Sequence, residues 1–263
     1  MNAHTQPQAQ PQARASQDTH PRVRLDADLA GCQRDDPAEH AIYGIMNAPL
    51  CTYPYAHMFL HDLFPADLYT EMLEHLPDDH AYRPADTGRY PERGRLMLAG
   101  ESGDDLDRLC GQNHSFWTHF KDEILTDSLW GALVERFVPT IASRMKEICW
   151  LHAFLGRDRG GYAISPHTDT SRKLLSVLVY LPNNSELSDC GTSIVVSDRP
   201  EHNVFDVPHS GRWDGFRVAK TVPFAMNSMF AFLVSDTSLH AVRPTPPGTV
   251  RNTLQFSIMM PSG

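Results

Sequence analysis

The segment GGYAISPHTD at residues 160–169 is the one around which the rest of this chain is organised. It predicts a β-strand that ends at two side chains able to bind a metal ion. Residues two apart on a strand point to the same face of a sheet, so His167 and Asp169 project together while Thr168 turns away. An imidazole nitrogen and a carboxylate oxygen on one face supply two ligands for a divalent metal. No other His-x-Asp sequence occurs in the chain, so these two residues stand out.

A third ligand is needed to hold an ion firmly, and His240 in the segment SLHAV at 238–242 is the best candidate. Two histidines and one carboxylate, with the remaining positions open, are the ligand set of non-haem Fe(II) oxygenases. The same ligands would also bind Zn, Mn, Co or Ni, so ligand type alone does not select iron. Three further histidines lack the two-residue offset from a carboxylate and are not expected to bind the metal: His152, His202 and His209.

An arginine follows the third ligand after a turn. The sequence Pro-Pro-Gly at 246–248 lets one strand end and sends the next strand back past the metal, which brings Arg251 into reach. An arginine at this place could hold a carboxylate with two parallel hydrogen bonds. Arg243 is the rival, but its odd offset from His240 puts it on the opposite face of an extended strand, so we rank it second.

The second half of the chain reads as a series of strands without intervening helices. Their separators are rich in Gly, Pro, Asn and Asp. Eight strands in a row indicate a two-sheet jelly roll. The expected strands are 151–155, 161–167, 174–181, 192–196, 218–222, 228–234, 238–242 and 253–260.

The first half has a different character. Residues 1–22 are rich in Gln, Ala and Pro and have too little apolar surface to offset the entropy of ordering, so we expect a disordered tail. We divide the remainder into a mixed helical and strand region at 38–149 and a catalytic core at 150–263. Within the first region we expect strands at 53–60 and 95–98, a loop at 78–94, and helices at 64–77, 114–125 and 129–149, the last kinked or divided by Pro139.

Composition excludes several classes of protein. The 263 residues are 41% hydrophobic and 21% charged, which is ordinary for a soluble globular chain. A net charge of −9 argues against nucleic acid as the main partner, because phosphate binding needs clustered basic residues. Five scattered cysteines without a Cys-x-x-Cys pair predict neither a disulfide framework nor a zinc knuckle. We see no secretory signal and no apolar run long enough to span a membrane, so we expect a cytoplasmic protein without a membrane partner.

The motifs of the second half resemble those of the iron(II)/2-oxoglutarate-dependent dioxygenases, nearest to the prolyl-4-hydroxylase-like branch. The matching segments lie in the family's order between about residues 150 and 260: GGY…HTD, LVYLP at 178–182, CGT at 190–192, NSMFAF at 227–232 and HAV…GTVR at 240–251. The family often has two glycines where this chain has Cys190-Gly191, and a glycine near Asn227. The resemblance implies a double-stranded β-helix, or jelly roll, with the metal at its open end and helices packed outside.

The resemblance also implies roles for individual residues. Fe(II) would be held by His167, Asp169 and His240, with 2-oxoglutarate and O₂ as co-substrates and succinate and CO₂ released as a C–H bond of the substrate is oxidised. Arg251 would hold the distal carboxylate of 2-oxoglutarate. Related enzymes often place a tyrosine near Tyr162 against the same co-substrate, and they favour hydroxylation when the metal carboxylate is intact, because related halogenases replace it with a small residue.

Other contacts follow from position along the strands. Thr253 lies two residues after Arg251 and shares its face, so its hydroxyl could add a hydrogen bond to 2-oxoglutarate. Three arginines near the site could contact an anionic substrate, although a solvated surface charge is the simpler interpretation for each of them: Arg95, Arg157 and Arg159. The segment 197–215 between two core strands is predicted to be a lid or substrate loop.

Three functions fit this pattern. The first is an oxygenase acting on a small molecule, amino-acid-like or a secondary metabolite, since we see no recruitment domain and no basic face. The second is a protein or peptide hydroxylase, which the family branch makes reasonable. The third is a metal-binding cupin without oxygenase activity, such as an isomerase or a sensor. Cupins usually add a further histidine or glutamate ligand, and no such glutamate stands near His167.

Overall fold

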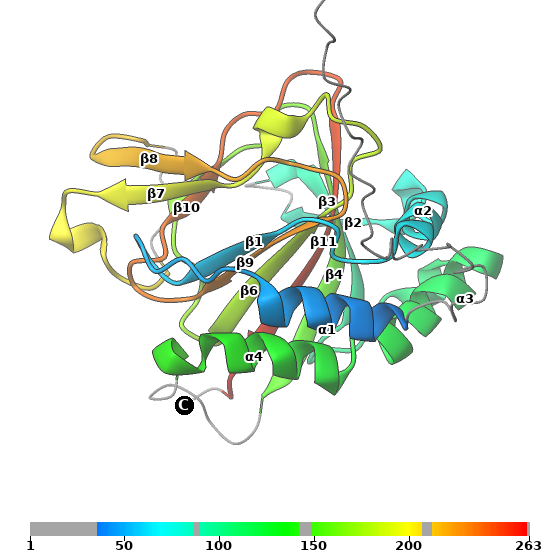
Figure 1. The fold of residues 1–263 in the computed structure, drawn as a ribbon. Helices are drawn as coiled ribbons and strands as arrows, with labels where there is room; N and C mark the ends of the chain where they lie inside the picture. Colours follow the sequence, from blue (N-terminus) through cyan, green and yellow to red (C-terminus); the bar gives the residue numbers. More distant parts are fainter. Residues whose placement is uncertain (1–35, 87–89, 142–148, 207–211, 262–263) are drawn as a thin grey trace, which may run out of the picture. The chain divides into compact units, whose positions relative to one another are not determined.

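Two antiparallel β-sheets form the centre of a computed structural model, which describes residues 36–86, 90–141, 149–206 and 212–261 (Figure 1). The large sheet has the strand order β1-β9-β6-β11-β4-β3-β2. Its strands are β1 (His57–Leu60), β2 (Arg83–Asp86), β3 (Tyr90–Ala99), β4 (Trp150–Arg159), β6 (Lys173–Tyr180), β9 (Ser228–Leu233) and β11 (Val250–Met259). The small sheet has the order β5-β10-β7-β8. Its strands are β5 (Ile164–His167), β7 (Ser193–Ser197), β8 (Phe216–Thr221) and β10 (His240–Val242).

The predicted jelly roll is confirmed. Each of the eight strands expected after residue 150 is present, as β4 to β11 in chain order. The strands end at the Gly- and Pro-rich segments that the sequence indicated as separators. The short first strand is also present, as β1 on the edge of the large sheet.

Strand β11 shows how alternation builds two different faces. Leu254, Phe256 and Ile258 are buried in the main hydrophobic core, on the side covered by helices. Arg251 and Gln255, on the alternate positions, line a cavity on the other side of the sheet. Because side chains two apart share a face, this one strand contributes polar side chains to the cavity and apolar side chains to the core.

Helices cover the outer face of the large sheet. They are α1 (Pro37–Asn47), α2 (Ala66–Glu74), α3 (Gly111–His119) and α4 (Asp127–Ile141), with a π-helical turn at Phe120–Ile124 and 3₁₀ turns at Asp79–Ala81, Leu106–Arg108, Ser188–Cys190 and Pro200–His202. Figure 1 shows α1 and α4 lying side by side across this face. Ile45, Trp117 and Leu133 from three helices are fully buried in the core that they share with the sheet. Burying an aliphatic side chain such as Ile45 or Leu133 contributes about 1.5–3 kcal/mol.

Helix α1 has no counterpart in the prediction, although its start carries a clear local signal. The Asp36 carboxylate accepts a hydrogen bond from the amide of Ala38 at 2.8 Å, and Pro37 occupies the first helical position. Both features favour a helix start, because they satisfy or remove amides that have no partner within the helix.

The expected loop at 78–94 is wrong. Residues 83–86 and 90–99 form β2 and β3, with Arg83 paired to Arg95 in the register of the sheet. The Pro, Gly and Arg content resembles a loop, but Gly94 permits a close approach in which an added Cβ would lie 2.8 Å from the Cβ of Tyr82. Tertiary packing therefore overrides local composition here.

The helix expected at 129–149 is present over the part of it that the structure describes, as α4. Helix α4 runs without interruption through position 139 to Ile141, and Cys149 lies outside any helix directly before β4. The segment 142–148 and the expected tail at 1–22 lie outside the described residues. The described helices and strands belong to one compact unit, Asp35–Gly263. Among the described residues, no helix is both long enough and apolar enough to cross a membrane.

Candidate metal centre

The structure brings the three predicted ligands together. His167 ends β5 and His240 begins β10, and the two residues face each other in the register of the small sheet with ring centroids 4.1 Å apart. Asp169 follows two residues after His167. One ligand atom from each residue lies within 4.8 Å of the others, so a single ion could contact all three after small side-chain movements.

Both imidazole rings are held in the same way. Nδ1 of His167 lies 3.0 Å from the carbonyl oxygen of Ser165, and Nδ1 of His240 lies 3.0 Å from the carbonyl oxygen of Ser238. A carbonyl can only accept, so each contact places the proton on Nδ1 and leaves the Nε2 lone pair free for a metal. Burial lowers the pKa of His240, which outweighs the nearby Asp169 carboxylate and keeps the ring neutral.

The carboxylate ligand is held by two side chains of β6. The hydroxyl of Ser176 donates to Oδ2 of Asp169 at 2.6 Å, and the ammonium of Lys173 lies 3.1 Å from Oδ1. Burial by itself would raise the pKa of Asp169, but Lys173, the two histidines and Ser176 together hold it well below its usual range. Asp169 is therefore ionised and oriented, as a metal ligand must be.

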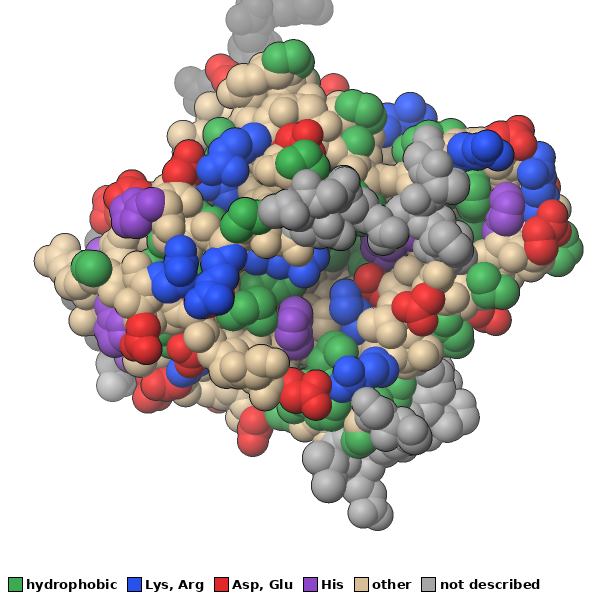
Figure 2. Space-filling view, turned by 180° about the vertical axis from the view of Figure 1, so that it is seen from behind, with side chains coloured by type: hydrophobic (Ala, Val, Ile, Leu, Met, Phe, Trp, Pro, Cys, Tyr) green, Lys and Arg blue, Asp and Glu red, His purple; other side chains and the backbone are tan. Residues whose placement is uncertain are grey.

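A cavity of about 540 Å³ lies over this group of ligands. Its walls come from both sheets, and the three ligands open into it together with polar side chains of β3, β4 and β11. Figure 2 shows the hollowed face of the protein, where basic, histidine and hydrophobic side chains gather near the middle. Among the described residues, His167, Asp169 and His240 form the one group of three or more metal-binding side chains close enough to share an ion.

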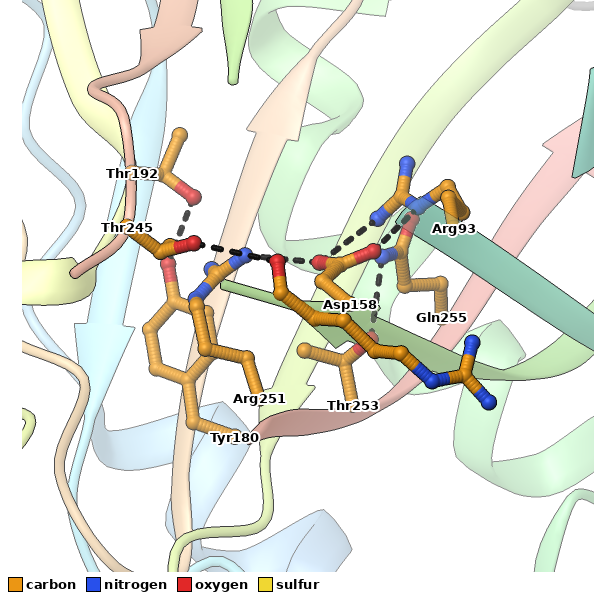
Figure 3. A network of polar contacts seen from close by, with 9 residues as sticks. Arg93, Asp158, Tyr180, Thr192, Thr245, Arg251, Thr253 and Gln255 are labelled. Carbon is orange, nitrogen blue, oxygen red and sulfur yellow. Dashed lines mark hydrogen bonds and ion pairs between the residues drawn. The ribbon is translucent and has the colours of Figure 1, made fainter. Parts of the chain in front are cut away.

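Arg251 lies in the same cavity but already has a protein partner. Its Nη1 donates to Oδ2 of Asp158 at 2.7 Å, and the same carboxylate accepts from Nε of Arg93 at 2.7 Å and from Nη2 of Arg93 at 3.3 Å (Figure 3). Asp158 is fully buried, and both arginines are at least nine-tenths buried. We call these three residues the arginine cluster. The three neighbouring strands β11, β4 and β3 place them in one row across the large sheet.

The arginine cluster carries a net positive charge. Two guanidinium groups face one carboxylate, which leaves one unit of positive charge in a buried place. Burial would lower the pKa of Arg93, but Asp158 raises it by more, so Arg93 remains charged. The Nε of Arg251 is buried and has no hydrogen-bond partner among the described residues, and the guanidinium lies 4.9 Å from the ring centre of Phe224. The cluster is suited to receiving one further carboxylate.

Tyr162 lines the cavity from the turn that precedes β5. Gly161 adopts a φ of +93°, a conformation that favours glycine. The carbonyl oxygen of Tyr162 accepts a hydrogen bond from the amide of Thr245 at 3.0 Å, and the guanidinium of Arg93 lies 4.7 Å from the centre of the Tyr162 ring. Burial raises the pKa of the Tyr162 hydroxyl, so it stays protonated and able to donate.

Of the remaining residues predicted to contact the co-substrate or substrate, only some line the cavity. Thr253 is buried and accepts a hydrogen bond from the Gln255 amide at 3.0 Å, and Gln255 lines the cavity while Thr253 does not. Arg95 lines the cavity. Arg157 and Arg159 do not, because both turn to the carboxylate of Asp79 at 2.8 and 3.1 Å.

Sequence reasoning missed four residues of this site. Asp158 and Arg93 complete the arginine cluster, and Ser176 and Lys173 hold the carboxylate ligand. A signal existed for Asp158, because alternation places it on the face opposite its arginine neighbours in β4. Arg93 fell in the segment wrongly expected to be a loop, so its face could not be assigned. The predicted 197–215 loop contributes Asp206 to the cavity wall, and residues 207–211 of that loop lie outside the described residues.

No protein-family model and no curated protein sequence match the chain. Its fold does match solved structures. A structure of prolyl 4-hydroxylase from Phytophthora capsici is 17% identical over 87% of this chain and 67% of that chain, with a TM-score of 0.52. A prolyl-4-hydroxylase from Pseudomonas putida is 15% identical over 84% of this chain and 100% of that chain, with a TM-score of 0.48. HygX from Streptomyces hygroscopicus, solved with nickel, 2-oxoglutarate and hygromycin B bound, is 11% identical over 78% and 82% of the two chains, with a TM-score of 0.48.

At these identities the likeness is one of fold. The match to the Phytophthora structure agrees with the jelly roll expected from the sequence. The described residues thus define a jelly-roll protein with a buried group of two histidines and one carboxylate beside an arginine-lined cavity.

Proposed function

We propose that this protein is an Fe(II)/2-oxoglutarate-dependent oxygenase. One observation carries the proposal: the group His167, Asp169 and His240 opens into the same cavity as Arg251, whose cluster holds one unpaired positive charge. A metal site beside a buried carboxylate receptor is what a co-substrate with two carboxylates requires. The fold shared with a prolyl 4-hydroxylase supports the same assignment.

The ligands fit iron. Two neutral imidazoles and one ionised carboxylate are the ligand set that leaves positions open for co-substrates, and each ligand already has an outer hydrogen bond that orients it. When bound, Fe(II) would supply the oxidation of a substrate C–H bond by O₂, coupled to the oxidative decarboxylation of 2-oxoglutarate to succinate and CO₂.

The protein's own residues position the co-substrate. Arg251, supported by Arg93 through Asp158, would bind the carboxylate far from the metal. Tyr162 lines the cavity beside Arg93 and would donate from its protonated hydroxyl. We propose that Thr253 does not contact 2-oxoglutarate directly. Its hydroxyl accepts a hydrogen bond from the Gln255 amide and would act by orienting that amide.

The substrate in this proposal is a small molecule that is hydroxylated or otherwise oxidised at carbon. The cavity of about 540 Å³ falls within the range of small-ligand sites, about 300–1,000 Å³. Part of that volume would be taken by 2-oxoglutarate. We also propose that the protein acts in the cytoplasm, where 2-oxoglutarate is available.

Metal-dependent binding of 2-oxoglutarate is the test. Under anaerobic conditions, calorimetry should detect 2-oxoglutarate binding to the Fe(II)-loaded protein and no comparable binding to the metal-free protein. Admission of O₂ should then release succinate. Asp169→Ala should weaken metal binding by more than the roughly 10–100-fold typical of losing an outer hydrogen bond, and succinate should disappear.

Asp79→Ala is the matched control, because this carboxylate is exposed and pairs with Arg157 and Arg159 outside the cavity. It should bind metal and release succinate like the wild type. Near-normal metal binding and turnover in Asp169→Ala would contradict the ligand assignment. Tight metal binding without any 2-oxoglutarate binding would instead favour a jelly roll that binds metal without oxygenase activity.

A further inference from the structure

The basic side chains that line the cavity differ in whether they pair with a carboxylate of the protein. Four basic side chains face it: Arg93, Arg95, Lys173 and Arg251. Three of these have a carboxylate partner. Arg93 and Arg251 pair with Asp158, and Lys173 pairs with Asp169. Arg95 is the exception, since within the described ranges of the chain it forms neither an ion pair nor a side-chain hydrogen bond.

The surroundings of Arg95 hold it in place without pairing it. Its guanidinium lies 4.9 Å from the ring centre of Phe154, and its Nε is buried with no hydrogen-bond partner among the described residues. Of the two acids in the cavity wall, Asp169 is engaged by Lys173, and Asp206 makes no ion pair with Arg95 in the described part of the chain. A buried donor without a partner is costly, so such a group needs a partner from outside the protein, which can be water or a ligand.

A second unsatisfied group lies near the same phenylalanine. His152 lines the cavity two residues before Phe154 on β4, with the two ring centroids 5.7 Å apart. Its Nδ1 is buried and has no partner among the described residues. Burial, with help from Lys173 and Arg95, lowers the pKa of His152, so its ring is neutral and offers one N–H donor. We call Arg95 and His152, which both contact the ring of Phe154, the anion subsite.

We propose that the anion subsite binds a carboxylate of the substrate, which makes the substrate a small carboxylic acid. This inference rests on the proposed oxygenase function. The planar guanidinium matches the two oxygens of a carboxylate, and the imidazole supplies a further donor. Charge favours a carboxylate over a phosphate ester, because one unpaired cation balances one negative charge and a dianion would leave an excess.

The anion subsite is distinct from the place proposed for 2-oxoglutarate. Arg251, Asp158 and Arg93 form one row across the sheet, and Arg95 belongs to the next row, opposite Gly156. Each place has one unpaired positive charge of its own. The cavity thus offers two separate receptors for carboxylates, one for the co-substrate and one for the molecule that is oxidised. The two other arginines first considered for this role are excluded by their pairing with Asp79.

Acetate is the probe for the test. The protein is labelled with ¹⁵N-arginine, loaded with diamagnetic Zn(II) and saturated with 2-oxoglutarate, so that the metal and the arginine cluster are occupied. The Nε–H signal of Arg95 should then shift saturably with acetate and stay unchanged with acetamide, its neutral counterpart. Arg95→Gln should weaken acetate binding by about tenfold or more, as expected for losing a charged hydrogen-bond donor. Arg157→Gln, the control, should leave it unchanged.

Several results would overturn the assignment. They are an Arg95 signal that ignores acetate, equal responses to acetate and acetamide, equal acetate affinity in Arg95→Gln, or tighter binding of methyl phosphate than of acetate. If 2-oxoglutarate itself shifts the Arg95 signal and blocks acetate, then Arg95 anchors the co-substrate and the anion subsite is refuted. If Arg95→Gln does not fold, the wild-type signal and Arg95→Lys decide the question.

The two proposals fail in different ways. Calorimetry on the Zn(II) protein first establishes whether 2-oxoglutarate binds. Acetate binding at Arg95 without any 2-oxoglutarate binding would refute the oxygenase proposal. The anion subsite would then remain a carboxylate-binding site, but not a substrate site of an oxygenase. Binding of 2-oxoglutarate without an acetate response would sink the anion subsite alone.

Discussion

Replacing Arg251 by alanine should remove co-substrate affinity while sparing the fold. The arginine cluster has two guanidinium groups and one carboxylate, so the loss of Arg251 leaves Arg93 and Asp158 as a neutral pair joined by hydrogen bonds of 2.7 and 3.3 Å. The substitution therefore leaves no buried charge without a partner. The unpaired positive charge that would receive 2-oxoglutarate is lost, and removing one partner of a buried charged pair costs about 2–5 kcal/mol. This corresponds to an affinity lower by roughly 30-fold to several thousand-fold.

Asp158→Asn should show the opposite pattern. It leaves Arg93 and Arg251 buried together without a carboxylate, and an uncompensated buried charge costs about 3–5 kcal/mol of stability. That is a large part of the roughly 5–15 kcal/mol that stabilises a typical domain. The affinity for 2-oxoglutarate should not fall, since the positive charge of the cluster increases. Saturation with the co-substrate should restore about 2.7 kcal/mol at 100 times its dissociation constant.

The assay has two parts. Calorimetric titration of the metal-loaded protein under anaerobic conditions gives the 2-oxoglutarate affinity, and urea unfolding gives the stability. Arg251→Lys should recover part of the affinity, because a point charge cannot reproduce two-pronged binding. Arg243→Ala is the control: this exposed residue lies over the ring of Trp213 at 4.9 Å and should change neither quantity by more than about 0.5 kcal/mol. Wild-type affinity in Arg251→Ala, or a stability loss there equal to that of Asp158→Asn, would refute the reasoning.

Two further substitutions test the supports of the site. Ser176→Ala removes the 2.6 Å hydrogen bond to Asp169 and should weaken metal binding by about 10–100-fold with little loss of stability; unchanged metal affinity in a competition titration would argue against this orienting role. Gly191→Ala should destabilise the protein by at least about 1–3 kcal/mol, because the added Cβ would lie 1.7 Å from the carbonyl oxygen of Val222; a wild-type urea midpoint would show that the backbone can move aside.

Much of the fold and the metal centre could be read from local pattern. A strand alternates with a period of two, so a two-residue spacing was enough to predict that His167 and Asp169 share a face. The structure brings the two side chains together beside His240, although β5 ends at His167 and Asp169 lies just beyond the strand. The same rule, with Gly and Pro at the breaks, predicted the eight strands of the jelly roll. These inferences succeed because they depend on backbone geometry that neighbouring residues determine.

The charges of the cavity depended on tertiary structure. Asp158 lies 93 positions from Arg251, and only the pairing of β4 with β11 brings them into contact. Three arginines looked alike in the sequence, yet Arg157 and Arg159 turn to Asp79 while Arg95 enters the cavity. Local pattern predicts which face a side chain takes, but its partner comes from a distant part of the chain and is set by sheet register. The same limit explains the missed β2–β3 hairpin, whose strands are held by packing that composition does not reveal.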